Sequence, residues 1–501
     1  MDIDLLYAEV MQKLILENKI ARVSQKLISS TKNDDRVQQV YDVLKGSKMF
    51  PKPMIVQKCA VKSTVYRNLG NKNFQNHNDY EAWQYYNLAL LHAPVDSVDY
   101  IFALANRSAV FFDLKKYEEC LNDIEQVSNM GYPERLKDKL LKRESSCKEA
   151  LSKPLLIDEK NTDAIETMYS MKGSRNPSYS NSIEIYEIGT LALRTVIKAR
   201  CEQPDWQSLF NIISEVEANL NTEYRGCTRV DDKWVYDSQS YATIHALVSN
   251  IEKRSVSDIF RKGVTAAVFL HILMKETEFL KDAKTGIVKR VGGLLLHHIM
   301  TVPTNMHGIS VNTPTSEGKY VNDMSLGSAA YAFFSLLNHS CSPNVTRFSR
   351  FGTGNMKLIA IRPIKKGMQL FDNYGVHHAT QDRESRQSTL NFQYKFVCTC
   401  EACVDNWPTY HNLGAAKNLP KLIAEKKKKI LSPNAIEKLE RGCKDIAMAL
   451  YKPLCELITV LDNYAPCVEL ADCQESLKQC LGIYEGFLPF GFTKVIDWDV
   501  S

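Results

Sequence analysis

The sequence predicts an α+β protein in which helical regions enclose a short region of strands. Apolar residues recur with helical spacing over much of the first 300 residues and again after Trp407. Between about residues 300 and 375, short apolar runs such as 357–361 alternate with glycine and proline, which is typical of strands. Cys398, Cys400 and Cys403 then form the closest group of cysteines, which predicts a metal-bound loop after the strands.

The charge balance argues against direct binding to nucleic acid. The 501 residues include 63 Lys plus Arg and 58 Asp plus Glu, giving a net charge of +5 that is spread along the chain. The one dense basic run is 426–429. Its simplest interpretation is a solvated helix face, and the alternative is a localisation signal or a patch for an anionic partner.

The sequence predicts neither secretion nor a membrane anchor. The first residues are acidic and no cationic segment leads into an apolar core, so we expect no signal peptide. The longest apolar stretch, 264–274, is far shorter than the roughly 20 residues of a membrane span. We therefore expect a protein of the cytoplasm, the nucleus or both, in which most of the 14 cysteines are buried thiols.

An internal repeat lies within residues 65–152. Its two copies resemble the 34-residue tetratricopeptide (TPR) pattern, in which small residues let paired helices approach closely and a proline ends each unit. The charged segment 134–152 is expected to be a capping helix, and the concave face of such an array would bind a peptide partner. A plain helical bundle is the alternative. The repeat positions are Leu69, Gly70, Ala82, Tyr86, Ala89 and Pro94 in the first copy, and Ser108, Phe111, Tyr117, Cys120, Ile124, Val127 and Pro133 in the second.

Three short motifs decide the interpretation of the second half of the chain. They are Asn338-His339-Ser340-Cys341, then Asp372-Asn373-Tyr374-Gly375, then the cysteines at 398, 400 and 403. Each motif alone could be a cap or a turn. Together, in this order and spacing, they resemble the C-terminal half of a SET domain and its post-SET zinc loop. With the TPR-like block, the chain resembles the SET-and-MYND family in its TPR-containing branch.

This resemblance implies a protein-lysine methyltransferase that uses S-adenosyl-L-methionine. It also implies a pseudoknot, in which the segment from Asn338 lies against the segment that carries the tyrosine. Tyr374 resembles the catalytic tyrosine, although a packed turn tyrosine remains the alternative. The residues that the resemblance places at the cofactor are Asn305, Ser335, Asn338, His339, Tyr374 and Phe396, and those at the lysine channel are Tyr394 and Phe396.

The chemistry of methyl transfer explains these residue types. The attacking lysine must be a neutral amine, and a narrow apolar channel disfavours its charged form and so lowers its pKa. A tyrosine hydroxyl and backbone carbonyls can hold the amine in line with the methyl group. Aromatic walls suit the alkylammonium product through cation–π contact.

The cysteines predict one structural zinc site. Cys398, Cys400 and Cys403 leave one tetrahedral position open, and the family resemblance assigns it to Cys341. A closed four-thiolate site is structural, so the zinc is expected to fix the loop rather than react. Buried free thiols are the alternative.

Two parts that the family usually has are missing from the sequence. No Gly-x-Gly, which marks the first SET strand, occurs between residues 150 and 200, and Cys201 and Cys227 cannot supply a MYND finger. An isoform or gene prediction that lacks one exon block would give such a sequence. The alternative to an active enzyme is therefore a catalytically impaired TPR/SET scaffold or interaction protein, and a weaker alternative is a regulator of transcription. The substrate, a histone or another protein, is left open.

The predicted organisation has seven segments. They are a helical lead-in and linker (1–64), the TPR-like repeats (65–152), a polar linker (153–182), a helical SET insert (183–300, with helices expected at 186–199, 242–259 and 264–278), the C-terminal half of the core SET domain (301–385), the post-SET zinc loop (386–408) and a C-terminal helical region (409–501).

Overall fold

The fold was analysed in a computed structural model of the whole chain. The residues that it describes are 3–51, 58–94, 97–114, 116–152, 180–314, 318–349 and 356–485. Most of the predicted linker 153–182, where the Gly-x-Gly was sought, and the tail after 485 lie outside these ranges. Within them, no helix is both long and apolar enough to cross a membrane.

The largest hydrophobic core joins helices from distant parts of the sequence. Residues 1–64, expected as a lead-in, supply three of its helices. Val40 meets Gly263 and Val37 meets Gly292 so closely that a Cβ atom on either glycine would lie within 3.1 Å of the valine. Small residues therefore let the first segment pack directly on the helical insert. The helices are α1 (Ile3–Leu16), α2 (Ile20–Ser29), α3 (Asn33–Ser47), α9 (Ser180–Cys201), α10 (Trp206–Ala218), α12 (Val256–Lys275) and α13 (Thr285–Asn305).

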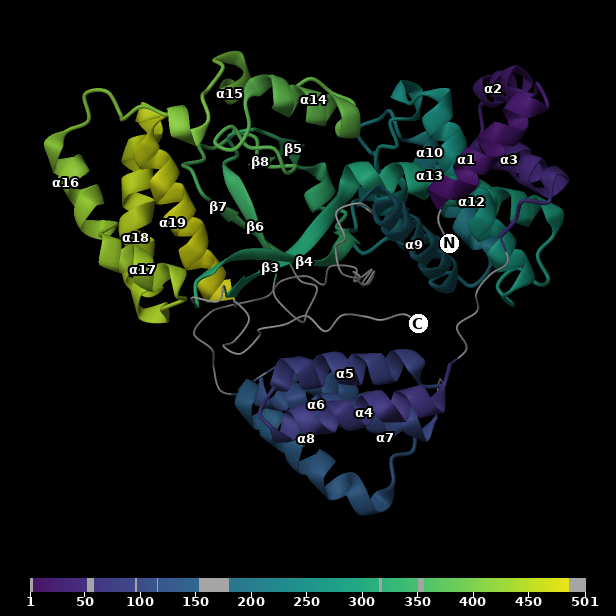
Figure 1. The fold of residues 1–501 in the computed structure, drawn as a ribbon, viewed down its shortest axis with the longest axis horizontal. Coiled ribbons are helices and arrows are strands. Elements are labelled where there is room, and N and C mark those ends of the chain that lie inside the picture. The colour runs from purple at the N-terminus through teal and green to yellow at the C-terminus, as the bar shows by residue number, and fades with distance from the viewer. Residues whose placement is uncertain are drawn as a thin grey trace.

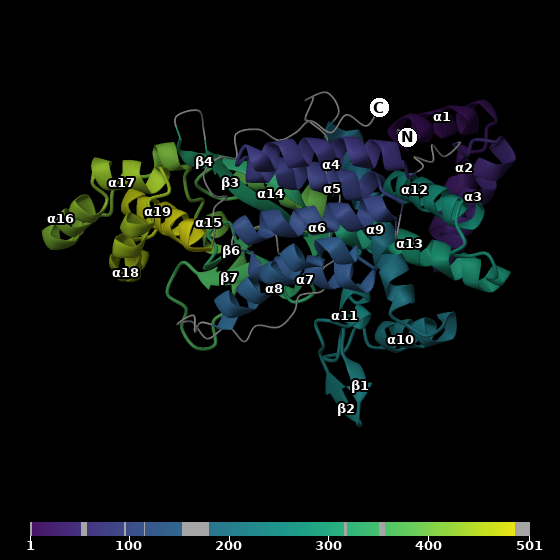
Figure 2. The ribbon, with the colours of Figure 1, turned by 90° about the horizontal axis from the view of Figure 1, so that it is seen from below.

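The repeat region forms a helical array that Figures 1 and 2 show as a separate layer. Its helices pack as two successive pairs, α4 with α5 and α6 with α7, and α8 closes the second pair. Gly70 is required here, because a Cβ atom at this position would lie 2.6 Å from the buried ring of Tyr86. The helices are α4 (Ala60–Gln75), α5 (Asp79–His92), α6 (Val98–Asp113), α7 (Tyr117–Asn129) and α8 (Lys137–Ser152), so the array begins five residues before the predicted boundary.

The helical insert differs from the prediction at one place. The continuous helix expected over 242–259 is wrong: α11 (Tyr241–His245) ends early, and α12 starts only at Val256. Asn250 adopts a left-handed conformation with φ of 52°, which interrupts the helix. The Ser255 side chain then accepts a hydrogen bond from the Asp258 amide and caps α12. A short hairpin, β1 (Thr228–Val230) with β2 (Lys233–Val235), precedes this break.

The strand region is confirmed, but its described strands form separate pairs rather than one mixed sheet. Two pairs are antiparallel, β3 (Met306–Pro314) with β4 (Tyr320–Ala330) and β6 (Val345–Ser349) with β7 (Met356–Ala360). The third pair is parallel, β5 (Asn338–His339) with β8 (Phe371–Asp372).

The parallel pair interlaces two segments of the chain. The Ser340 amide donates to the Asp372 carbonyl at 2.8 Å, and the His378 amide donates to the Cys341 carbonyl at 3.0 Å. The Asn344 side chain adds a hydrogen bond to the Gln369 carbonyl at 2.9 Å and accepts one from the Phe371 amide at 2.8 Å. The two motifs that the sequence singled out thus lie against each other.

The chain after the strands is helical. The basic run lies on α16, where Lys426 and Lys427 form ion pairs with Glu456 and Asp472. The core of this region packs α18 and α19 against the strand pair β6–β7. The helices are α14 (Arg383–Tyr394), α15 (Glu401–Val404), α16 (Lys421–Ile430), α17 (Pro433–Glu440), α18 (Lys444–Leu461) and α19 (Val468–Glu485).

Candidate active site

Tyr374 follows β8 and is held at three points. Its hydroxyl donates to the Leu337 carbonyl, its amide donates to His339 Nδ1 at 3.0 Å, and its carbonyl accepts from the Tyr394 hydroxyl at 3.1 Å. Burial, with the nearby charge of Asp372, raises the pKa of Tyr374 to about 12. The phenol is therefore a neutral hydrogen-bond donor at physiological pH, not a base.

His339 connects Tyr374 to the cysteines. Because its Nδ1 accepts from the Tyr374 amide, the ring proton lies on Nε2, which is 3.3 Å from Cys341 Sγ. Burial lowers the pKa of His339 to about 4, so the ring stays neutral at physiological pH. Both ring nitrogens thus contact protein groups, and the side chain fixes Tyr374 relative to Cys341.

Aromatic side chains surround the tyrosine, as predicted. The ring of Tyr394 lies 4.8 Å from that of Tyr374, and the ring of Phe396 lies 6.4 Å from Tyr374 and 6.2 Å from His339. Helix α14 ends at Tyr394 because Lys395 takes a left-handed conformation with φ of 63°, which redirects the chain to Phe396. We call these four rings, together with the cysteine cluster, the tyrosine half of the site.

Asn305, Ser335 and Asn338 form what we call the cofactor half. The Ser335 hydroxyl is 2.9 Å from the Asn305 carbonyl, so the structure brings these two residues together. The Asn305 amide nitrogen donates to the Val248 and Thr301 carbonyls at 2.8 and 2.7 Å. That nitrogen is committed to the protein, which leaves the side-chain oxygen for a ligand.

The cofactor half is more open than the tyrosine half. The side chain of Asn338 is exposed at the end of β5, and the neighbouring Phe333 and Leu336 are 54% and 52% exposed. The exposed Asn338 amide can supply hydrogen bonds to the edge of a nucleoside.

The four predicted zinc ligands lie together. The Sγ atoms of Cys341, Cys398, Cys400 and Cys403 are all within 4.8 Å of one another, and those of Cys341 and Cys403 are 3.6 Å apart. A tetrahedral zinc with bonds of about 2.3 Å requires sulfurs about 3.8 Å apart, so the donor set fits this ion. Hydrogen bonds from the Cys341 and Cys398 thiols lower the pKa of Cys400, which favours its thiolate.

A buried arginine beside the cysteines was missed from the sequence. The side chain of Arg386 is fully buried on α14 and donates to the Gln381 and Ala402 carbonyls at 2.7 and 3.0 Å. It also lies 3.7 Å from Cys403 Sγ. The sequence did offer one sign of this burial. Arg386 lies four residues before the apolar Leu390, so both side chains point to the same side of the helix.

Two further arginines hold the tyrosine-bearing segment and the zinc loop. Arg347 on β6 pairs with the buried Asp372 at 3.0 Å and donates to the Asn373 carbonyl at 3.1 Å. Arg362 forms ion pairs with Glu401 on α15 and with Asp462 before α19, the latter at 2.6 Å. Their partners are distant in sequence, so no local pattern indicated them.

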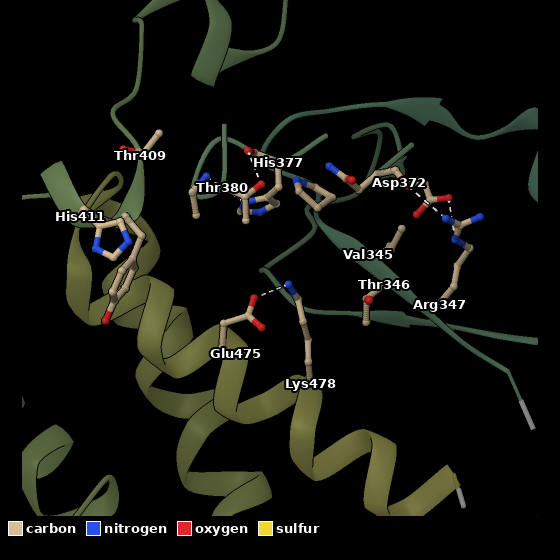
Figure 3. Close-up of a pocket in the computed structure, with 14 residues that line it drawn as sticks. Val345, Thr346, Arg347, Asp372, His377, Thr380, Thr409, His411, Glu475 and Lys478 are labelled. Atoms are coloured by element: carbon tan, nitrogen blue, oxygen red, sulfur yellow. Dashed lines mark hydrogen bonds and ion pairs between the residues drawn. The ribbon is translucent and has the colours of Figure 1, made fainter. Parts of the chain in front are cut away.

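A cavity of about 820 Å³ adjoins the tyrosine-bearing segment. Its wall includes Asp372 and Asn373, the two residues before Tyr374, and Lys478 and Glu475 from α19. Figure 3 shows the Arg347–Asp372 pair on the strand side of the lining and the Lys478–Glu475 pair on α19. Burial and the charge of Lys478 lower the pKa of His377 to about 2, so this lining ring is neutral. The cavity therefore presents charges of both signs between the strands and the C-terminal helices.

Comparison with known proteins identifies the family. The SET-domain family model matches residues 12–375, which is more than half of the chain and includes the helices before the array. Protein-lysine N-methyltransferase SMYD4 of Danio rerio is 21% identical over 70% of this chain and 66% of its own length. SMYD4 of Homo sapiens is 37% identical over 21% of this chain and 13% of its own length. N-lysine methyltransferase SMYD2 of Homo sapiens is 35% identical over 16% of this chain and 17% of its own length.

The chain thus spans at most about two thirds of the length of these relatives. The family match and the interlaced motifs of the structure agree with the resemblance seen in the sequence. The chain belongs to the SET-domain family and is similar, within it, to the SMYD proteins.

Proposed function

We propose that this chain is a protein-lysine N-methyltransferase that uses S-adenosyl-L-methionine. The observation that carries the proposal is the contact of the Tyr374 hydroxyl with the Leu337 carbonyl, inside a set of aromatic rings. This arrangement places hydrogen-bonding groups, the Tyr374 hydroxyl and the Leu337 carbonyl, next to apolar aromatic rings. A neutral lysine amine needs both.

The residues of the tyrosine half would act by positioning. The Leu337 carbonyl can accept a hydrogen bond from the amine, and the Tyr374 hydroxyl fixes the direction of that carbonyl. The rings of Tyr394 and Phe396 exclude water, which favours the uncharged amine, and they suit the methylated product through cation–π contact. Because the pKa of Tyr374 is about 12, the proton of the lysine goes to solvent rather than to this phenol.

The cofactor half would hold the nucleoside end of the methyl donor. When bound, S-adenosylmethionine supplies an electrophilic methyl group. The exposed Asn338 amide and the Asn305 side-chain oxygen are the polar groups for this ligand, and Ser335 orients the Asn305 backbone. His339 contributes through its backbone and through its hold on Tyr374, because its ring is already bonded to the protein.

We assign one structural zinc ion to Cys341, Cys398, Cys400 and Cys403. All four positions of a tetrahedral ion are then filled by thiolates, which leaves none for substrate or water. The ion would join the interlaced segment at Cys341 to the loop that carries Phe396. Zinc binding thereby supports the lysine channel without taking part in the chemistry.

The cavity beside Asp372 and Asn373 suits the polypeptide that flanks the target lysine. Its walls carry charges of both signs, and two of its lining residues, Asp372 and Asn373, directly precede Tyr374 in the sequence. The substrate of this proposal is a protein, either a histone or another one.

Radiolabelled methyl transfer to arrayed proteins and histone peptides tests the proposal. We expect label on lysines of specific targets with the wild-type chain, and none above background with Tyr374→Phe. If neither protein transfers label although both are folded and loaded with zinc, the chain is not an active enzyme under these conditions and the proposal fails.

Two observations favour a second candidate, an interaction protein that keeps the SET fold as a scaffold. The cofactor half exposes Phe333 and Leu336, and residues 150–200 contain no Gly-x-Gly of the kind that usually approaches the cofactor. A scaffold would keep zinc and stability but would bind no S-adenosylmethionine. Cofactor binding therefore separates the two functions.

A further inference from the structure

Lys478 places a positive charge in the cavity beside the tyrosine-bearing segment. Its ammonium group pairs with Glu475, three positions earlier on α19, at 2.7 Å. The Lys478 side chain is 26% exposed, whereas that of Glu475 is 68% exposed. Figure 3 shows Lys478 extending from α19 into the cavity. The cation therefore lies in the wall of the cavity, while its partner is mostly in contact with solvent.

Displacement of Glu475 by another anion would cost the protein little. An exposed ion pair contributes little to stability, because water screens the charges and both side chains lose rotational freedom. An anionic group that enters the cavity is less well solvated, so its attraction to Lys478 is stronger there than in open solvent. Glu475, which is largely exposed, can then turn back to water. Lys478 is therefore available to a ligand.

His377 supplies a second hydrogen-bond donor in the same cavity. Its Nδ1 accepts from the Ala379 amide at 3.1 Å, so the proton of the neutral ring lies on Nε2. Among the described residues, no group accepts a hydrogen bond from this Nε2. Because Lys478 helps burial to lower the pKa of His377, the two side chains lie near each other. An anion in the cavity could meet both donors.

The second carboxylate in the wall is already paired inside the protein. Asp372 is 2% exposed and forms an ion pair with Arg347 at 3.0 Å. Arg347 also donates to the Asn373 carbonyl at 3.1 Å, which fixes the pair in place. The charge of Asp372 is thus neutralised within the wall. Apart from the exposed Glu475, the described lining of the cavity offers no carboxylate to a cation, so it favours an anionic ligand.

We propose that this cavity selects protein substrates with an acidic residue, Asp or Glu, close to the target lysine, and that Lys478 determines this specificity. The substrate carboxylate would accept charge-assisted hydrogen bonds from the Lys478 ammonium and from His377 Nε2. A cavity of this volume is about 12 Å across, and an extended chain advances about 3.3 Å per residue, so the acidic residue lies within about four positions of the lysine. The inference rests on the proposed methyltransferase function and names its substrate class.

Methylation of a positional set of peptides by the full chain tests the proposal. Each peptide has one central lysine with four residues on either side. These are Ala, Ser or Gly, except for one position that carries Asp, Arg or Ala. With radiolabelled S-adenosylmethionine, we expect Asp at one of the positions to raise the label at least tenfold over Ala, and Arg there to lower it. The gain from Asp should shrink as salt is raised.

Two variants assign the preference to the cavity. Lys478→Glu should reverse it, so that Arg is preferred over Asp at the same position. Glu475→Gln removes the competing carboxylate and should raise the label on the Asp peptide about threefold. The matched control, Lys281→Glu, breaks an exposed pair with Glu278, also three positions away, and should leave the preference unchanged. Circular dichroism checks that every variant is folded.

The outcomes separate this inference from the proposed function. An acidic preference that Lys478→Glu reverses and Lys281→Glu keeps supports the inference. Label without such a preference, a preference that survives Lys478→Glu, or more label with phosphoserine than with Asp overturns it and leaves the methyltransferase function intact. A wild-type chain that binds S-adenosylmethionine but labels no peptide overturns the inference alone. A folded chain that neither binds the cofactor nor labels a peptide contradicts both.

Discussion

The tyrosine half and the cofactor half of the site are built on different principles. In the tyrosine half, the buried side chains bond to one another, and His339, Tyr374 and Tyr394 fix each other without any ligand. In the cofactor half, Asn338 is exposed and apolar side chains face solvent. The first half is therefore determined by the fold, whereas the second depends on what binds there. Separate experiments on each half can show which one limits activity.

The largest effect is expected from loss of the zinc ligands. Apparent binding free energies of structural zinc are on the order of 10 kcal/mol, and this energy stabilises the fold around the metal. Cys400→Ser should abolish zinc in the purified protein and lower the melting temperature markedly. Metal analysis and thermal denaturation measure both quantities. The exposed Cys201→Ser is the control and should change neither. A stable Cys400→Ser protein with unchanged metal content would contradict the assignment.

Tyr374→Phe tests whether the tyrosine half determines the reaction rate without affecting cofactor binding. The change removes one hydroxyl and keeps the ring, so the packing with Tyr394 and Phe396 remains. Removal of one preorganised donor commonly lowers a rate by about 100-fold. We expect a drop of that size in the methyl-transfer rate with an unchanged affinity for S-adenosylmethionine. An equal fall in affinity would mean that the hydroxyl belongs to the cofactor half.

Arg362→Met tests how the zinc loop is fastened to the rest of the protein. The side chain is 12% exposed and pairs with both Glu401 and Asp462. Breaking fully buried pairs costs about 3–5 kcal/mol, so we expect a slightly smaller loss of about 2–3 kcal/mol in the free energy of unfolding. Urea denaturation measures it. The exposed pair Lys281–Glu278 supplies the control, because Lys281→Met should cost less than about 1 kcal/mol.

The last effect concerns a region outside both halves, where His298 is fully buried and 2.7 Å from the Tyr241 hydroxyl. Burial lowers its pKa well below 6.5, and that of His297 to about 3. Below pH 6.5 these two histidines bind protons in the unfolded chain but stay neutral in the folded chain. The free energy of unfolding is therefore unaffected by these histidines above this pH. It falls as the pH decreases, by about 1.4 kcal/mol per pH unit for each histidine.

Denaturation at pH 7, 6 and 5 checks this slope. His298→Asn should be less stable at pH 7 but should lose stability less steeply on acidification than the wild type. An unchanged slope would show that His298 is not kept neutral by the fold.

The sequence predicted the tyrosine half better than the rest of the site. Tyr374, His339 and the cysteines stand in short motifs with fixed spacing, and the structure brings them together. Arg347, Arg362 and Arg386 were missed because an isolated arginine in a sequence is normally a surface residue, and burial becomes visible only with its partners. The hydrogen bond from the Asn305 amide nitrogen to the Val248 carbonyl was not predicted for a similar reason, since Val248 lies in a loop 57 residues earlier.

The helical regions also show what the sequence alone could not predict. Periodicity predicted helical structure within residues 1 to about 60 and a helix over 242–259, but it does not say what these segments pack against. The first segment lies in the main core because glycines on α12 and α13 admit it, and the second is broken around Asn250. The N-cap Ser255 followed by Asp258 was a local signal of a new helix start that could have been used.

Calorimetric titration of S-adenosylmethionine tests the central claim most directly. The wild-type chain and Asn338→Ala would be compared after zinc content and folding have been verified. The account predicts micromolar binding by the wild type and binding at least tenfold weaker in Asn338→Ala. No binding by the folded, zinc-loaded wild type would contradict the proposed methyltransferase function and favour the scaffold.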